Sequence, residues 1–159
     1  MNIQPALSAD AQKLTQIAFA AKRHWGYPEE YYQAWKNELT ITGAYIRNNK
    51  VFKYLLNKEI IGFYSLVFNP KGFKSGDVYI EKGYWLEHIF ILPEHHRKGF
   101  GREMISHLKE LATDKFISEI LIFVDPYAKG FYEKTGATFA YNSKSSIPGR
   151  MIPIYKLKI

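Results

Sequence analysis

Residues 84–124 contain the pattern that most constrains what this chain can fold into. The apolar run Tyr84–Leu92 predicts a buried strand that Pro93 ends, and an amphipathic helix follows over about residues 99–113. A second apolar run, Ile117–Val124, predicts another buried strand. A strand, a helix and a strand in this order form a crossover connection, so the two strands are expected to be parallel neighbours.

The rest of the chain adds strands and helices on both sides of this crossover. Three segments are expected to be irregular. Residues 43–49 are expected to form a helical turn or a loop, residues 69–82 a loop with a short irregular strand, and residues 143–151 a loop. Hydrophobic spacing predicts strands over 1–6, 51–56, 60–68, 138–142 and 152–157, and helices over 8–22, 28–39 and 126–135. This order predicts an α/β (α+β) fold with a central mixed β-sheet flanked by helices. The length of 159 residues predicts one domain, 1–159.

Composition removes several classes of function. The chain has no cysteine, which excludes a thiol nucleophile, a thiolate zinc site and a disulfide scaffold. The sequence shows no secretory signal and no apolar run near the roughly 18 residues of a membrane span, so a soluble cytoplasmic protein without a membrane partner is expected. A net charge of +7 favours anionic partners. The charges are scattered without a run of five, which favours a phosphate-bearing small molecule over nucleic acid.

The segment between the first buried strand and its helix has the features of an anion site. Arg97 and Lys98 stand directly before Gly99 and Gly101, at the start of the helix. Glycine lets the backbone approach a ligand closely, and the first N–H groups of a helix attract negative charge. The segment is neither a Walker A loop nor a Rossmann fingerprint. An ordinary glycine turn with solvated basic side chains is the alternative.

Two motifs resemble those of the GCN5-related N-acetyltransferases. The run His96-Arg97-Lys98-Gly99-Phe100-Gly101 is similar to the family's acetyl-CoA loop, Gln/Arg-x-x-Gly-x-Gly/Ala, with His96 in place of the usual first residue. The segment 125–139 resembles the family's Asn-x-x-Ala-x-x-Phe-Tyr-Glu-Lys-x-Gly-Phe pattern, with Asp125 in place of asparagine. The resemblance covers nearly the whole chain.

The resemblance implies a splayed sheet and a binding site for acetyl-CoA. The strands over 84–92 and 117–124 would part toward their carboxyl ends, and the pantetheine arm would lie between them. Asp125 and Tyr132 would border the ligand on the other side. The remaining implied cofactor residues are the strand residues Ile89, Phe90 and Ile91 and the loop residues Arg97, Lys98, Gly99, Phe100, Gly101 and Arg102. No metal is expected, because the histidines are poorly spaced for ligation.

The implied reaction is direct transfer of an acetyl group to a primary amine, which suits a chain without cysteine. Tyr132 matches the family's tyrosine that protonates the leaving thiolate; a packed core tyrosine is the alternative. Alternation along the strand puts Glu87 on the face of Trp85, Ile89 and Ile91, and His88 on the opposite face. Apolar neighbours would raise the pKa of Glu87, as a general base near neutrality requires. A structural ion pair is the other interpretation of Glu87, and a packed imidazole that of His88.

The acceptor amine is not readable from the sequence. Trp25 and Tyr27 lie between the first two helices, which in relatives cover the acceptor side, and could hold an amine by cation–π contact or form a hydrophobic hinge. Arg150 could bind a substrate carboxylate or be solvated. Two rival functions remain, a non-catalytic acyl-CoA sensor on the same fold and a basic nucleic-acid-binding module. A homodimer is a further expectation, since dimers are common in the family.

Overall fold

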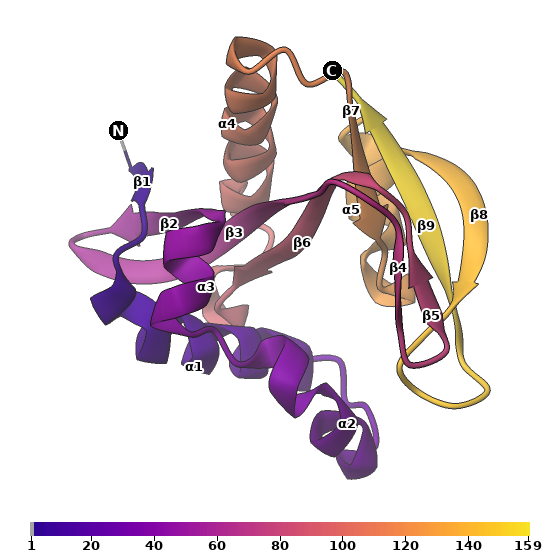
Figure 1. Cartoon of the computed structure of the whole chain (residues 1–159). Coiled ribbons are helices and arrows are strands. Elements are labelled where there is room, and N and C mark those ends of the chain that lie inside the picture. Colours follow the sequence, from indigo (N-terminus) through magenta and orange to yellow (C-terminus); the bar gives the residue numbers. More distant parts are fainter. Residues whose placement is uncertain (1) are drawn as a thin grey trace. The chain divides into compact units, whose positions relative to one another are not determined.

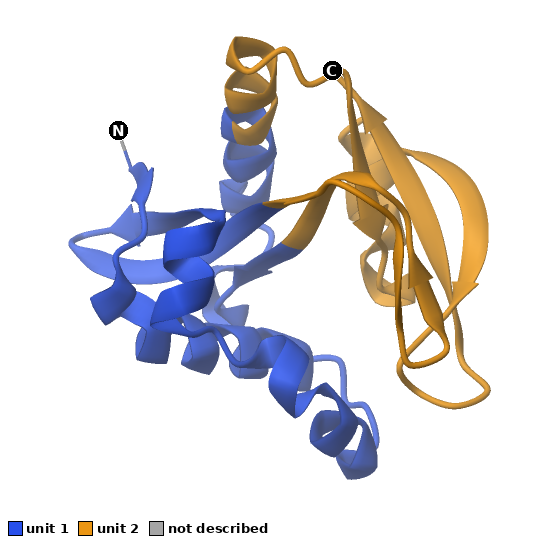
Figure 2. Cartoon of the chain, viewed as in Figure 1, with its two compact units in different colours: residues 1–66, 88–107 blue, residues 67–87, 108–159 orange. Residues whose placement is uncertain are grey.

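The computed structural model describes residues 2–159; Met1, the first residue of the strand expected over 1–6, lies outside them. The described chain divides into two compact units (Figure 2). Unit 1 contains residues up to Leu66 together with His88–His107, and unit 2 contains Val67–Glu87 and Leu108–Ile159. Strands β3 (Glu59–Asn69) and β6 (Gly83–Ile91) and helix α4 (Phe100–Asp114) each run from one unit into the other.

Unit 1 combines antiparallel strands with three short helices. Residues 43–49, expected as a turn or a loop, form α3, and the Thr42 hydroxyl caps this helix by accepting from the N–H of Tyr45. Besides its parts of β3, β6 and α4, the unit contains β1 (Ile3–Pro5), the 3₁₀ turn η1 (Ser8–Asp10), α1 (Ala11–Arg23), α2 (Glu29–Leu39), α3 (Gly43–Asn48), β2 (Lys50–Leu56) and the 3₁₀ turn η2 (Pro93–His95).

The core of unit 1 lies between its helices and its sheet. Strands β1, β2 and β3 pair antiparallel (Figure 1). Helix α1 buries residues at helical spacing, as the sequence predicts, and the central part of β3 is buried on both faces. Gly62 of β3 allows β6 to come close, because a Cβ at Gly62 would lie 2.7 Å from the carbonyl oxygen of Phe90.

Unit 2 contains the second half of the crossover and the C-terminal strands. The segment 69–82 forms a two-stranded hairpin, β4 with β5, where one irregular strand was expected. The predicted helix over 126–135 is a 3₁₀ turn followed by a shorter α-helix that Gly136 ends at φ +95°. Besides its parts of β3, β6 and α4, this unit contains β4 (Phe73–Ser75), β5 (Val78–Ile80), β7 (Glu119–Phe123), the 3₁₀ turn η3 (Pro126–Ala128), α5 (Lys129–Lys134), β8 (Thr138–Lys144) and β9 (Met151–Lys158).

The sheet is mixed, as the sequence predicts. Its hydrogen-bonded order is β1-β2-β3-β6-β7-β9-β8, and β6 pairs with β7 in parallel. This confirms the predicted crossover. The parallel register runs only from Tyr84 opposite Ile120 to Leu86 opposite Ile122, although β6 continues to Ile91.

A search of the helices over residues 2–159 finds none with both the length and the apolar character of a membrane span.

Candidate functional site

The segment between β6 and α4, residues 97–102, is here called the phosphate loop. Two of its residues have left-handed backbone, Arg97 at φ +61° and Gly99 at φ +91°. The N–H of Glu103 makes the first helical hydrogen bond, to the carbonyl of Gly99 at 3.1 Å. The N–H groups of residues 100–102 therefore precede the helical bonding pattern and can serve an anion, whose charge the helix dipole also favours.

The side chains of the phosphate loop present positive charge to water. Arg97, Lys98 and Arg102 are exposed. Phe100 instead anchors the start of α4, because its ring packs against that of Tyr54 with centroids 5.1 Å apart. Unit 1 thus combines a fixed helix start, available backbone donors and exposed cationic side chains. This is the arrangement that a multiply charged phosphate ligand requires.

The strand that leads to the phosphate loop carries the three predicted pantetheine contacts, Ile89, Phe90 and Ile91, all partly exposed. His88, directly before them, is buried among the rings of Tyr45, Phe63 and Phe90. Burial, with a smaller contribution from the positive charge of Lys22, lowers the pKa of His88 to about 4. The expected packed imidazole is confirmed, and His88 is neutral at physiological pH.

Residues 24–27, in the connection between α1 and α2, are here called the acceptor segment, after the role expected of them. Tyr27 stacks on Tyr31 with ring centroids 5.7 Å apart. The ammonium of Lys22 lies 5.6 Å from the ring centroid of Tyr27 and 4.5 Å from that of Trp35. Tyr27 thus makes a cation–π contact within the chain, with Lys22. The expected contact with an acceptor amine stays a prediction.

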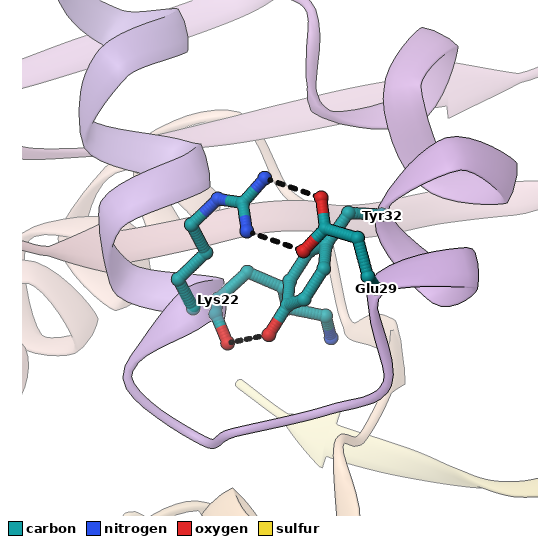
Figure 3. Close-up of polar contacts among 4 residues, drawn as sticks. Lys22, Glu29 and Tyr32 are labelled. Atoms are coloured by element: carbon teal, nitrogen blue, oxygen red, sulfur yellow. Dashed lines mark hydrogen bonds and ion pairs between the residues drawn. The ribbon is translucent and has the colours of Figure 1, made fainter.

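Polar contacts fix both ends of the acceptor segment (Figure 3). The guanidinium of Arg23 donates to both carboxylate oxygens of Glu29, at 2.9 and 3.2 Å. The hydroxyl of Tyr32 donates to the backbone carbonyl of Lys22 at 3.4 Å. These contacts tie the end of α1 to the start of α2, so the five residues between the two helices have fixed ends.

Unit 2 contains the predicted proton donor. Tyr132 lies on α5 and is buried, with only 7% of its surface exposed. Asp125 begins η3, where its carboxylate accepts from the N–H of Tyr127 at 3.0 Å. Burial first, and the negative charge of Asp125 second, raise the pKa of Tyr132 well above its usual value. The phenol is therefore protonated at neutral pH, as a proton donor requires.

The expected environment of Glu87 is wrong. Its side chain is exposed, although we expected apolar neighbours to withdraw it from water. Glu87 is the first residue of β6 beyond its pairing with β7, which ends at Leu86. Its role as a base stays a prediction.

The residues predicted to bind the acceptor belong to different units. Arg150 lies in unit 2, in the loop between β8 and β9, where its backbone N–H and carbonyl bond Ile147 and Ser145. Trp25 and Tyr27 belong to unit 1. Among the described residues, no group of three or more side chains is arranged to hold a metal ion.

Sequence reasoning missed the contacts of Lys22 and His96. The spacing of Tyr27, Tyr31 and Trp35, four residues apart, could have indicated an aromatic stripe on one helix face. No sequence signal places the Lys22 ammonium over that stripe. His96 stood out only as a departure from the family pattern; in the structure its Nε2 bonds the carbonyl of Ile91 at 2.9 Å.

Comparison with known proteins agrees with this architecture. An N-acetyltransferase named PaiA from Thermoplasma acidophilum, solved in complex with coenzyme A, has 18% identity and a TM-score of 0.77, over 99% of this chain and 98% of that one. The ribosomal-protein-S18-alanine N-acetyltransferase of Escherichia coli has 17% identity and a TM-score of 0.68, over 99% and 92% of the two chains. These likenesses show the fold. No curated protein sequence matches the chain.

The sequence itself matches a family model. The model of the acetyltransferase (GNAT) family covers residues 11–137, from the start of α1 to the residue after Gly136. The matched range includes the phosphate loop, Tyr132 and Asp125. The chain therefore belongs to the GNAT acetyltransferase family.

Proposed function

We propose that the protein transfers the acetyl group of acetyl-CoA directly to the primary amine of an acceptor. The observation that carries the proposal is the phosphate loop, with left-handed backbone at Arg97 and Gly99 leading into the first turn of α4. The proposed contacts are the backbone N–H groups of 100–102 with the pyrophosphate, and Arg97, Lys98 and Arg102 with the remaining phosphate charge. Membership of the family and the coenzyme A complex of the Thermoplasma relative support this ligand.

The proposed chemistry needs no covalent enzyme intermediate. The nitrogen of the neutral amine attacks the thioester carbonyl carbon, and the bond between carbon and sulfur breaks as the electron pair leaves on sulfur. Tyr132 is proposed to donate its phenolic proton to the departing thiolate. A phenol carries this proton at neutral pH, and the burial of Tyr132 favours the protonated form further.

The acceptor nitrogen must lose a proton, and the exposed position of Glu87 changes how we expect this to happen. An efficient carboxylate base is usually withdrawn from water, whereas Glu87 is exposed. We propose that Glu87 acts through water and contributes less than Tyr132. The proposed compartment is the cytoplasm, where acetyl-CoA is available.

An assay with a panel of amines tests the proposal. The panel contains amino acids, polyamines, aminoglycosides and peptides with free amino termini, and free coenzyme A is detected as a new thiol. We expect amine-dependent release of coenzyme A from wild type and a large loss with Tyr132→Phe. Binding of acetyl-CoA without release for any amine would instead identify a sensor. No binding of acetyl-CoA at all would contradict the proposal.

A further inference from the structure

We propose that His96 is a positioning residue that couples the phosphate loop to the acceptor segment. The inference rests on the proposed function, because it takes the phosphate loop as the coenzyme A site. His96 stands directly before Arg97, the first residue of the loop, and its side chain contacts two other parts of unit 1. One contact is polar and faces β6, and the other is aromatic and reaches the acceptor segment.

The polar contact fixes the start of the phosphate loop. The Nε2 atom of His96 lies 2.9 Å from the carbonyl oxygen of Ile91. A carbonyl only accepts, so Nε2 carries the proton and donates. Ile91 is the last residue of β6, and only η2 with its flanking residues separates it from His96. The bond therefore closes this short connection and holds the end of β6 against the residue that precedes Arg97.

The aromatic contact joins the same imidazole to residues 24 and 25. The ring of His24 meets that of His96 edge to face, with centroids 4.9 Å apart. The Trp25 ring stacks on His96 at 6.3 Å with an angle of 28° between the planes. His24 and Trp25 also touch each other, at 5.1 Å. Three rings from two distant parts of the sequence thus pack together.

The contact of His96 with His24 and Trp25 can affect the whole acceptor segment, because the ends of that segment are fixed. Its two ends are fixed by the contacts of Arg23 with Glu29 and of Tyr32 with the Lys22 carbonyl (Figure 3). The rings of His24 and Trp25, between those ends, pack on His96. A ligand that orders the phosphate loop would therefore change the packing of Trp25 through one imidazole ring.

Two substitutions separate the contacts. His96→Gln keeps an N–H donor for the Ile91 carbonyl and removes the ring, whereas His96→Phe keeps a ring and removes the donor. The readout is the indole N–H signal of Trp25 in ¹H–¹⁵N spectra during titration with coenzyme A, assigned by its loss in Trp25→Phe. The indole of Trp85, which donates to the Glu81 carbonyl in unit 2, reports whether each variant is folded.

In wild type, coenzyme A should shift the Trp25 signal. In His96→Gln most of this shift should disappear while the affinity for coenzyme A stays within about threefold of wild type. His96→Phe should keep the shift at saturation, with affinity weakened about tenfold by loss of one hydrogen bond. Should His96→Gln not fold, His24→Ala, at an exposed position, removes one ring contact and should reduce the shift.

Several results would overturn the coupling. One such result is a Trp25 signal that does not shift when coenzyme A is added to wild type. Another is a full shift of that signal in folded His96→Gln. If His96→Gln does not fold, an undiminished shift in His24→Ala counts in the same way. Failure of coenzyme A to bind wild type would instead contradict the proposed function itself.

Discussion

The candidate functional groups of the two units have opposite surroundings. In unit 1 the phosphate loop is exposed, and its means of binding are backbone N–H groups and solvated cations. In unit 2 the candidate group is a single buried side chain, Tyr132, whose pKa burial raises. A charged ligand can be bound by groups that are exposed to water, because many weak contacts together supply the binding free energy. Proton donation depends on one group whose surroundings set its acidity.

The largest effect should come from blocking the phosphate loop in unit 1. Gly101→Val places a branched side chain where the backbone must approach the pyrophosphate. Losing two hydrogen bonds to a charged group, about 1.5–3 kcal/mol each, should weaken acetyl-CoA binding at least about 100-fold. Calorimetric titration measures it, with Ala44→Val on the exposed side of α3 as the control. Unchanged affinity in a folded Gly101→Val protein would place the ligand elsewhere.

Removing the Tyr132 hydroxyl in unit 2 should affect turnover and spare binding. In Tyr132→Phe the ring that fills the buried site is kept, so kcat should fall by about 10- to 1,000-fold as general acid catalysis is lost. The dissociation constant for acetyl-CoA should change little. Steady-state rates and calorimetry on the same preparation measure both. Full turnover in the variant would make Tyr132 a core residue only.

The dependence of kcat on pH tests whether the pKa of Tyr132 is raised. The protonated phenol is the active form, so activity is lost as pH rises through its pKa. Because that pKa is raised, the loss should begin above the value of about 10 that an ordinary tyrosine has. The measurement is kcat against pH at saturating substrates. A falling limb centred at or below an ordinary tyrosine's pKa, and missing from Tyr132→Phe, would disagree with the buried environment.

A smaller effect is expected at Glu87, which is exposed. Glu87→Gln should lower kcat/KM near neutral pH by no more than about tenfold, less than a buried general base would contribute. Raising the pH should partly restore the variant, because more of the amine is then neutral. Glu59→Gln, at an exposed end of β3, is the matched control. An identical profile in wild type and Glu87→Gln would assign the acid limb to the amine or to another group.

Substitutions at two glycines, one in each unit, should change the free energy of unfolding in opposite directions. Gly62→Ala in unit 1 forces a methyl group toward the Phe90 carbonyl and the Ile91 side chain, and should cost about 1–3 kcal/mol. Gly130→Ala in α5 of unit 2 meets nothing within 4 Å, and should stabilise by about 0.5–1 kcal/mol. Denaturation with urea measures both. Equal effects would mean that the close approach of β3 and β6 is not required.

The sequence predicted those features that depend on local pattern. The crossover over 84–124 followed from apolar runs and a proline, and the parallel register of β6 and β7 confirms it. The phosphate loop followed from glycines and basic residues in a row. The failure at Glu87 has a different origin: strand alternation assigns a face, but whether that face is covered at one residue depends on tertiary packing, which alternation does not describe. The contacts of Lys22 and His96 likewise depend on tertiary packing.

The central claim is that unit 1 recognises the phosphates of the cosubstrate. Calorimetric titration of wild type with coenzyme A and, separately, with pantetheine, which lacks every phosphate, tests it most directly. The account predicts binding of coenzyme A and at least about 100-fold weaker binding of pantetheine, because the phosphate loop then has no ligand. Equal affinity for the two compounds would contradict the assignment of the phosphate loop.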